Sequence, residues 1–549
     1  MTTSFADPLE MQHVLFAELS RMFGKEVPLY DKSLAVNFRC NQAIVHLLSS
    51  GFSGFTVSDE ELLATSRERH GAIRIGREDE FRWITRYFAC FGMEPHNYYD
   101  MTKIGEKSQP VTATAFRSTI DPENRVFASL LRTSYFDPVI AERIDHLLSS
   151  RQVFSDRARS LVELCEQQGG LALDDAKLLI QEGTERIFKW TGEARGRDLY
   201  EELCAEGFKI AADIACFSSH HLNHLTPNTL CIDLYSNAMK WRMGTFDRSE
   251  FLKRAEHILA FLDEMVDTDW LLLHFRHLGH EDVASFDRAP VSSSARHEII
   301  STLVSSLDIE DLDLTRLPHN GYKDRTEGPD PGTQVLLRQD AYRSLTEPIR
   351  FVDETPPFES SHTARFGEIE ERFYAVTPKG RALYDECLAA RTSDSHSESS
   401  DAAKSFERFP RTLPELFESG LVHAIFEPSK ASLAGQVDIA TADIIQLMKE
   451  GVLDCRGMRY EDFLPISAAG IFASNLDQYG TDSTADHRPS YPRREFEEIV
   501  GCSIKDTVDV YRALQSRSIL DSLASLKIDH LLDESDRRRL EADLVSLMA

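Results

Sequence analysis

The chain has 549 residues, of which 42% are hydrophobic and 28% charged, a composition typical of a globular protein whose core needs no disulfide or metal for stability. Its formal net charge of -29 at pH 7 opposes binding to nucleic acids and anionic lipids, so we expect neither as a partner. A small anionic substrate would need a local cationic pocket against this field. An arginine beside a candidate metal site is therefore informative.

The nine cysteines are scattered and form no C-x-x-C pair. This pattern predicts free thiols in a reducing compartment, without a zinc ribbon or a redox motif. The first residues contain no basic stretch followed by an apolar run, and the longest apolar stretches are far too short to span a membrane. We therefore expect a soluble, cytoplasmic protein with no membrane partner.

Helices dominate the predicted elements of the N-terminal half. Apolar residues at helical spacing predict an amphipathic helix over 10–23. Residues 70–75 predict a short strand, and a helix is expected from about residue 77. Residues 138–215 are expected to be largely helical, because apolar residues recur there every three or four positions. At the end of this region, residues 211–217 are a small apolar run that fits either a strand or a helix end.

The C-terminal half alternates helices, strands and polar segments. Residues 240–330 are amphipathic and acidic, then irregular around 318–332, and we interpret them as a mostly helical insertion. Strands are expected at 335–338 and 364–376, and the polar segment 391–405 predicts a loop that buries no core. We expect an N-terminal part of the catalytic domain, the insertion, a C-terminal part of that domain and a helical tail, at residues 1–239, 240–330, 331–480 and 481–549.

One segment combines a histidine and an arginine that a strand would place on the same face. His70 and Arg74 are separated by roughly 13 Å along a backbone that rises ~3.3 Å per residue. A ligand with one end on a metal at His70 and a carboxylate at Arg74 fits that spacing. The alternative is a buried histidine bonded to a carbonyl group, beside an exposed arginine.

Two further segments contain candidate metal ligands. His220, His221 and His224 form a cluster of imidazoles, which are common metal ligands, although a polar loop is the alternative. Glu368 and Glu370 share one face of an expected strand, where carboxylates must be paired, protonated or metal-bound unless the strand lies at the surface. Two histidines and one carboxylate form the ligand set associated with non-haem iron(II) oxygenases, which leaves positions open for a chelating substrate and dioxygen.

Longer motifs run in a fixed order from about residue 30 to 480. They include E-R-H-G-A-I-R-I-G at 68–76, N-H-L-T-P at 223–227, H-T-A-R-F-G-E-I-E at 362–370 and F-L-P-I-S-A-A-G-I-F at 463–472. With these motifs the chain resembles the 2-oxoadipate dioxygenase/decarboxylase family, which is distantly similar in fold to hydroxymandelate synthase and the vicinal-oxygen-chelate enzymes. The resemblance implies an α+β fold in which a curved, vicinal-oxygen-chelate-like central sheet holds the metal and many helices surround it.

The resemblance also implies a cofactor and a set of site residues. The cofactor is iron(II), Fe(2+). Carried over by position, the metal ligands fall on His70, His224 and Glu368, and the substrate contacts fall on Arg74, Ile466 and Ser467. Glu368 is chosen over Glu370 because the ligand in this type of strand is the glutamate that opens the E-I-E stretch.

The activity that the resemblance implies is the conversion of 2-oxoadipate and O2 to 2-hydroxyglutarate and CO2, a step in lysine degradation. Two alternatives stay open. One is a metal isomerase or lyase of the vicinal-oxygen-chelate class that acts on a 2-oxo acid without O2. The other is a non-catalytic interaction protein that docks through its acidic insertion. Metal analysis and oxygen uptake separate these three hypotheses.

Overall fold

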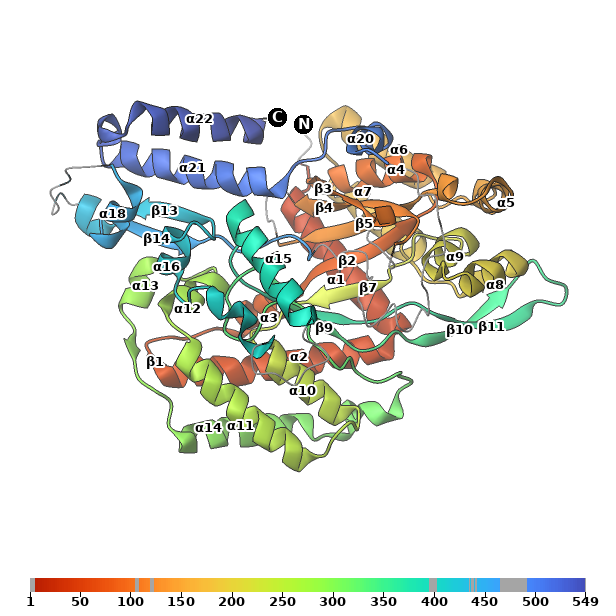
Figure 1. Cartoon of the computed structure of the whole chain (residues 1–549). Coiled ribbons are helices and arrows are strands. Elements are labelled where there is room, and N and C mark those ends of the chain that lie inside the picture. The colour runs from red at the N-terminus through yellow and green to blue at the C-terminus, as the bar shows by residue number, and fades with distance from the viewer. Residues whose placement is uncertain are drawn as a thin grey trace.

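A five-stranded sheet lies at the centre of the computed structural model of the chain, with helices on both of its faces (Figure 1). The structure describes residues 5–103, 108–118, 123–393, 402–433, 435, 439, 442–464 and 491–548. The strands follow the spatial order β3 (Met93–Asp100), β4 (Val111–Ser118), β5 (Arg125–Leu131), β2 (Glu68–Ile75) and β7 (His224–Pro227). Strand β2 runs parallel to β5 and antiparallel to β7. The expected α+β class is confirmed.

Strand β2 is buried along its whole length, because both faces of the sheet are covered. Ile73 and Ile75 belong to the largest hydrophobic cluster, which includes residues of the N-terminal helices. Ala72 belongs to a second cluster on the other face. Side chains alternate between the two faces of a strand, so His70 and Arg74 lie on the same face as Ala72, as predicted.

The N-terminal helices are α1 (Pro8–Glu26), α2 (Pro28–Gly51), α3 (Asp59–Ser66) and α4 (Glu78–Ala89), and both α1 and α3 begin at a residue whose side chain caps the helix. The side chain of Asp7 accepts a hydrogen bond from the backbone of Glu10, and Pro8 occupies the first turn of α1. Ser58 and Glu61 form a capping box at the start of α3. The amphipathic helix expected over 10–23 is confirmed.

A second, smaller sheet continues the surface of the central one. Strand β12 (Glu368–Arg372) pairs antiparallel with β9 (Leu337–Ala341). A parallel bridge between Asn228 and Glu370 sets β12 beside β7. This register puts His70, Thr226 and Glu368 next to one another on three neighbouring strands.

The two strands of this smaller sheet differ in their bounds from the strands predicted at 335–338 and 364–376: β9 is shifted toward the C-terminus and β12 is shorter. Strand β9 begins at Leu337 because Leu336 has a φ of 60°, a left-handed conformation that ends regular pairing. Strand β12 begins only at Glu368. Gly367, the residue before it, lies against the ring of Tyr342, where an added Cβ would come within 2.6 Å of a ring carbon. Of the strand expected over 364–376, only residues 368–372 form β12.

Helices fill the region between β5 and β7, as expected. They are α5 (Pro138–Ser149), α6 (Asp156–Gln168), α7 (Leu173–Glu182), α8 (Arg197–Ala205) and α9 (Lys209–Cys216). The small apolar run at 211–217, which fitted a strand or a helix end, forms most of α9. All its residues from Ile210 to Cys216 are buried, so α9 supplies part of the cluster that faces Ala72.

The region interpreted as an insertion is mostly helical and packs on α2. Helix α10 (Ile232–Arg242) leads into the region. The helices within it are α11 (Arg248–Met265), α12 (Thr268–His274), α13 (His280–Ala284) and α14 (Ser293–Leu307). Phe251 and Leu303 belong to the same cluster as Ile44 of α2, so the region shares the main core. Its status as an insertion and the four domain boundaries stay predictions.

The C-terminal part forms a hairpin and a separate lobe (Figure 1). The hairpin of β10 (Thr346–Phe351) and β11 (Phe358–Thr363) pairs with β6 (Glu193–Ala194). The lobe consists of α15 (Pro378–Ser393), α16 (Leu413–Glu418), β13 (Ala424–Pro428), α17 (Lys430–Leu433), α18 (Ile444–Lys449), β14 (Leu453–Gly457), α21 (Thr507–Ser525) and α22 (Glu534–Met548). Helix α20 (Arg493–Val500) lies outside this lobe and packs against α4 (Figure 1). The helical tail is confirmed. Much of the polar segment predicted at 391–405, residues 394–401, lies outside the described residues.

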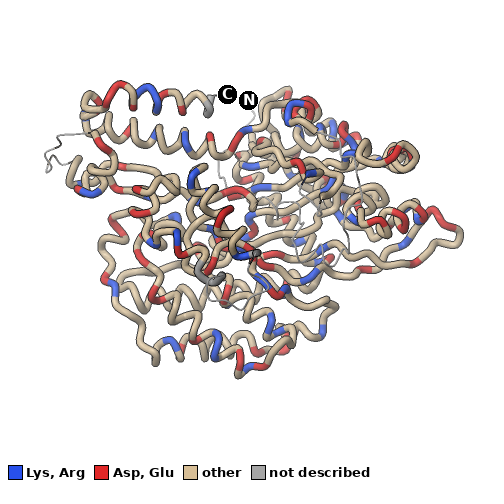
Figure 2. Tube along the Cα trace, in the orientation of Figure 1, with Lys and Arg blue, Asp and Glu red and all other residues tan. Residues whose placement is uncertain are grey.

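Charges are spread over the whole molecule, with acidic and basic residues interspersed along the chain (Figure 2). All nine cysteines are free, as the sequence predicted. Within the part of the chain that the structure describes, no helix has the length and apolarity required to cross a membrane.

Candidate metal centre

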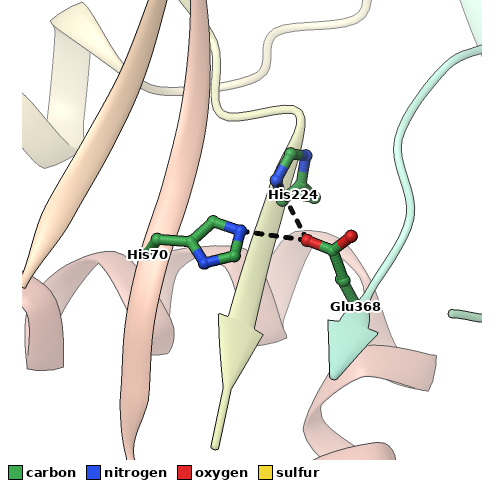
Figure 3. A group of neighbouring side chains, drawn as sticks. All are labelled: His70, His224 and Glu368. Carbon is green, nitrogen blue, oxygen red and sulfur yellow. Dashed lines mark hydrogen bonds and ion pairs between the residues drawn. The ribbon is translucent and has the colours of Figure 1, made fainter. Parts of the chain in front are cut away.

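Three strands bring His70, His224 and Glu368 together (Figure 3). His70 comes from β2, while His224 and Glu368 open β7 and β12. One ligand atom from each residue lies within 4.8 Å of the others, and the side chains are 1 to 3% exposed. The three segments that the sequence analysis singled out therefore meet in one buried site.

The Oε2 atom of Glu368 lies between the two imidazoles. It is 3.0 Å from Nε2 of His70 and 3.5 Å from Nε2 of His224 (Figure 3). The hydroxyl of Thr226 donates a hydrogen bond to the same oxygen at 2.7 Å and lies 2.9 Å from Nε2 of His70. Thr226 was not predicted, although it stands in the N-H-L-T-P motif two residues after His224. It fixes the carboxylate that faces the two rings.

The close approach of β2 and β7 depends on Gly71. An added Cβ at this position would lie 3.2 Å from the carbonyl oxygen of His224 and 3.0 Å from a side-chain carbon of Leu225. The backbone amide of Asn223 donates to the carbonyl of Ala72 at 3.0 Å. The glycine after His70 thus lets the strand that carries His224 lie directly against it.

His70 also meets a second carboxylate. Its Nδ1 atom lies 2.9 Å from Oε2 of Glu370. Arg125 donates to Oε1 of Glu370 at 2.9 Å, and Arg372 donates to its Oε2 at 2.9 Å, so two buried guanidinium groups hold this carboxylate. The ring of Phe463 packs edge-on at 4.8 Å from the ring of His70. Glu368 and Glu370 share one face of β12, as predicted, and they contact opposite nitrogens of the same imidazole.

The protonation states suit a metal. Burial lowers the pKa of His70, which Glu368 partly opposes, and burial lowers the pKa of His224 well below its usual value. Both imidazoles are therefore neutral near pH 7 and can bind a metal through a nitrogen lone pair. Within the described residues, Oε1 of Glu368 is buried without a hydrogen-bond partner. A divalent cation would compensate such an oxygen, so the donor set fits a metal ion.

Arg74 lies on the same face of β2 as His70, as predicted, and is 6% exposed. The sequence did not indicate its partner: Nη1 donates to Oδ2 of Asp213, in α9, at 2.7 Å. Burial alone would raise the pKa of Asp213, but the charges of His221 and Arg74 and a hydrogen bond with His362 hold it well below its usual value. Asp213 therefore fixes the guanidinium of Arg74 in place.

Only one histidine of the 220–224 cluster joins the metal site. Nε2 of His220 lies 3.2 Å from Oε2 of Glu80, and Nε2 of His221 lies 3.1 Å from Oδ1 of Asp213. These two histidines belong to ion networks beside the site. The predicted substrate contacts Ile466 and Ser467 lie outside the described residues.

The buried pair of imidazoles and the one carboxylate on three strands form a candidate metal site of the two-histidine, one-carboxylate class. The sequence model of the family described as 2-oxoadipate dioxygenase/decarboxylase matches residues 15–252 and 274–475. The chain belongs to this family, and the resemblance drawn from its motifs is confirmed.

Individual relatives match over almost the whole chain. A protein of Pseudomonas putida named 2-oxoadipate dioxygenase/decarboxylase is 30% identical over 535 residues, which cover 94% of this chain and 96% of the relative. One of Escherichia coli with the same name is 30% identical over 519 residues, covering 93% and 97%. The crystal structure of the Pseudomonas putida hydroxyglutarate synthase in complex with 2-oxoadipate superposes with a TM-score of 0.66 at 29% identity, covering 95% of this chain and 99% of that one.

Proposed function

We propose that this protein is an iron(II)-dependent enzyme that converts 2-oxoadipate and O2 to 2-hydroxyglutarate and CO2 in the breakdown of lysine. The observation that carries the proposal is the convergence of His70, His224 and Glu368 within 4.8 Å of one another in a member of this family. The relatives' names and the 2-oxoadipate in the Pseudomonas putida complex support the substrate. The reaction balances, since the six carbons and seven oxygens of 2-oxoadipic acid plus O2 reappear in the two products.

His70, His224 and Glu368 would hold the iron. When bound, iron(II) supplies chelation of the 2-oxo and adjacent carboxylate groups, a site for dioxygen and the electrons that activate it. The protein contributes three ligands and leaves the other coordination positions open. Thr226 keeps the Glu368 carboxylate turned toward the imidazoles, and Phe463 packs against the ring of His70 and helps to exclude water.

Arg74 would bind the distal carboxylate of the substrate. Chelation engages the 2-oxo group and the first carboxylate, so the second carboxylate needs a cation of its own. The planar guanidinium can donate two parallel hydrogen bonds, and Asp213 already holds it from one side at 2.7 Å. We assign the remaining substrate contacts to the main chain of Ile466 and the hydroxyl of Ser467, on the family resemblance alone.

We also propose that the central sheet is of the vicinal-oxygen-chelate type and that the protein acts in the cytoplasm. The succession β2–α4–β3–β4–β5, which returns β5 to lie parallel beside β2, supports the first point. The free cysteines support the second.

Oxygen uptake by the iron-loaded protein tests this function. The protein is loaded with iron(II) without oxygen, then mixed with a series of 2-oxo acids in an oxygen electrode, and the products are identified by mass. We expect one O2 consumed and one CO2 released per 2-oxoadipate, with 2-hydroxyglutarate formed. Conversion of 2-oxoadipate without oxygen uptake would instead establish the isomerase or lyase.

A further inference from the structure

We propose that Lys323 is a second cation of the substrate site and binds the distal carboxylate from the side opposite Arg74. This inference rests on the proposed function and deepens it, because it assigns recognition of a 2-oxo dicarboxylic acid to two cations on opposite flanks of the metal centre. Lys323 lies in the irregular stretch around 318–332, which the sequence analysis assigned to the insertion.

Backbone pairing places Lys323 in the same row as two metal ligands. The amide of Lys323 donates to the carbonyl of Ala341 at 3.1 Å, and Ala341 lies opposite Glu368 in the β9–β12 pair. Across β7 the row continues through Thr226 to His70. Laterally paired residues point to the same side of a sheet, so Lys323 faces the side of Glu368. Only a small alanine separates them, over two strand spacings of roughly 10 Å in total.

The side chain of Lys323 extends from this row toward the level of Arg74. Its Nζ lies 5.8 Å from the ring centroid of Phe366, and this ring stacks on His224 with centroids 4.8 Å apart. Phe366 precedes Glu368 by two residues, and this direction along β12 is the direction from His70 to Arg74 along β2. Lys323 and Arg74 thus flank the far end of the site from opposite strands.

The burial and charge of Lys323 suit an anionic ligand. The residue is 1% exposed, and burial lowers its pKa. The acidic groups that face it are Glu327, Glu368 and Asp340. Glu368 is committed to the metal centre, and burial raises the pKa of Asp340 to about 6. Arg74 and Lys323 both act electrostatically on His224, so both cations lie near this metal ligand.

A structural role makes a different prediction. If Lys323 serves only to balance Glu327 and Asp340, its removal destabilises the fold and affects every 2-oxo acid equally. If it binds the distal carboxylate, its removal affects dicarboxylic acids selectively. The comparison of 2-oxoadipate with 2-oxohexanoate, which has the same chain length and no distal carboxylate, separates the two roles.

The test is calorimetric binding to the full chain loaded with Zn(II), which holds substrate without turnover. The wild-type protein should bind 2-oxoadipate more tightly than 2-oxohexanoate. Lys323→Met should reduce this preference by roughly tenfold to a hundredfold, the usual effect of losing one buried charged hydrogen bond, and should change 2-oxohexanoate affinity little. Lys323→Arg should restore part of the preference. The control is Arg343→Met, which removes a half-exposed cation paired with Asp324 on the adjoining stretch.

A double variant tests whether the two cations bind the same group. When Arg74→Met and Lys323→Met are combined, the preference for 2-oxoadipate over 2-oxohexanoate should fall by less than the product of the two single effects. The reason is that both cations bind the same carboxylate. Lys323→Gln replaces Lys323→Met if the latter does not fold.

The outcomes distinguish failure of the role of Lys323 from failure of the proposed function. A wild-type protein that binds no 2-oxoadipate would overturn the proposed function and the role of Lys323 together. A wild type that prefers 2-oxoadipate, with a Lys323 variant that keeps the full preference or weakens both ligands equally, would overturn the role of Lys323 alone.

Discussion

Glu370 lies 2.9 Å from Nδ1 of His70, while Glu368 lies 3.0 Å from Nε2 of the same ring. The two carboxylates therefore have different roles, although they stand two residues apart on one strand. A carboxylate on the outer nitrogen of a metal-binding histidine selects the tautomer and orients the ring. We therefore expect Glu370, which Arg125 and Arg372 hold in turn, to position the ring of His70.

Replacement of Glu370 by glutamine should weaken iron binding without abolishing it. The amide lacks the charge that orients His70, and loss of such a group typically lowers metal affinity about 10- to 100-fold. The measurement is competition for iron(II) with a chelator. The matched control is Glu371→Gln, a buried glutamate beside Arg338 that does not contact His70. Equal iron affinity in Glu370→Gln and the wild type would show that Glu370 has no role at the metal.

Replacement of Arg74 by methionine should spare iron binding and impair turnover of 2-oxoadipate. Loss of one side of a charge-assisted, buried pair costs about 2–5 kcal/mol, or roughly 30-fold to several-thousand-fold in kcat/KM. Steady-state kinetics on 2-oxoadipate and 2-oxohexanoate should show a narrower preference for the dicarboxylic acid. Arg74→Lys should recover only part of the activity, because a point charge lacks the planar fork.

The buried pair with Asp213 requires a control for the Arg74 variants. Removal of Arg74 leaves the Asp213 carboxylate with His221, His362 and the side-chain amide of Asn223. Thermal unfolding of Arg74→Met should therefore be compared with that of Arg74→Met combined with Asp213→Asn. If activity falls equally on dicarboxylic and monocarboxylic substrates in a stable variant, Arg74 does not recognise the distal carboxylate.

The metal-free fold should lose stability in acid partly through His274. This residue is 2% exposed and stacks on Trp270 with ring centroids 3.8 Å apart, and burial lowers its pKa to about 3. The unfolded chain takes up this proton near pH 6.5, so stability is lost as the pH falls from about 6.5 toward 3, by roughly 2 kcal/mol at pH 5. Urea unfolding in chelator at pH 7.5 and 5.0 measures the loss. Between the two pH values, the free energy of unfolding of His274→Gln should fall by roughly 2 kcal/mol less than that of the wild type. An equal fall in both proteins would exclude this role of His274.

Local pattern was sufficient for most elements and for the candidate ligands. The amphipathic spacing of α1 and the strand that carries His70 follow from single stretches of sequence. The family motifs then indicated Glu368 rather than Glu370 as the ligand, and the structure groups Glu368 with His70 and His224.

The partners of these residues could not be predicted because they depend on tertiary packing. Asp213 lies in a run that fitted two secondary structures, and only its packing as part of α9 brings it to Arg74. The left-handed φ of Leu336 delays the start of β9 to Leu337, two residues after the predicted start at 335. Lys323 stands in a stretch without periodicity, and only its backbone bond to Ala341 places it beside the metal site.

The most direct test of the central claim is the iron content of four variants after anaerobic loading and desalting. His70→Ala, His224→Ala and Glu368→Ala should each retain almost no iron, because a site with three protein ligands has none to spare. Glu370→Ala and the wild type should retain measurable iron, close to one atom per chain in the wild type. Loss of iron from Glu370→Ala together with retention by Glu368→Ala would contradict the assignment of Glu368 as the third ligand.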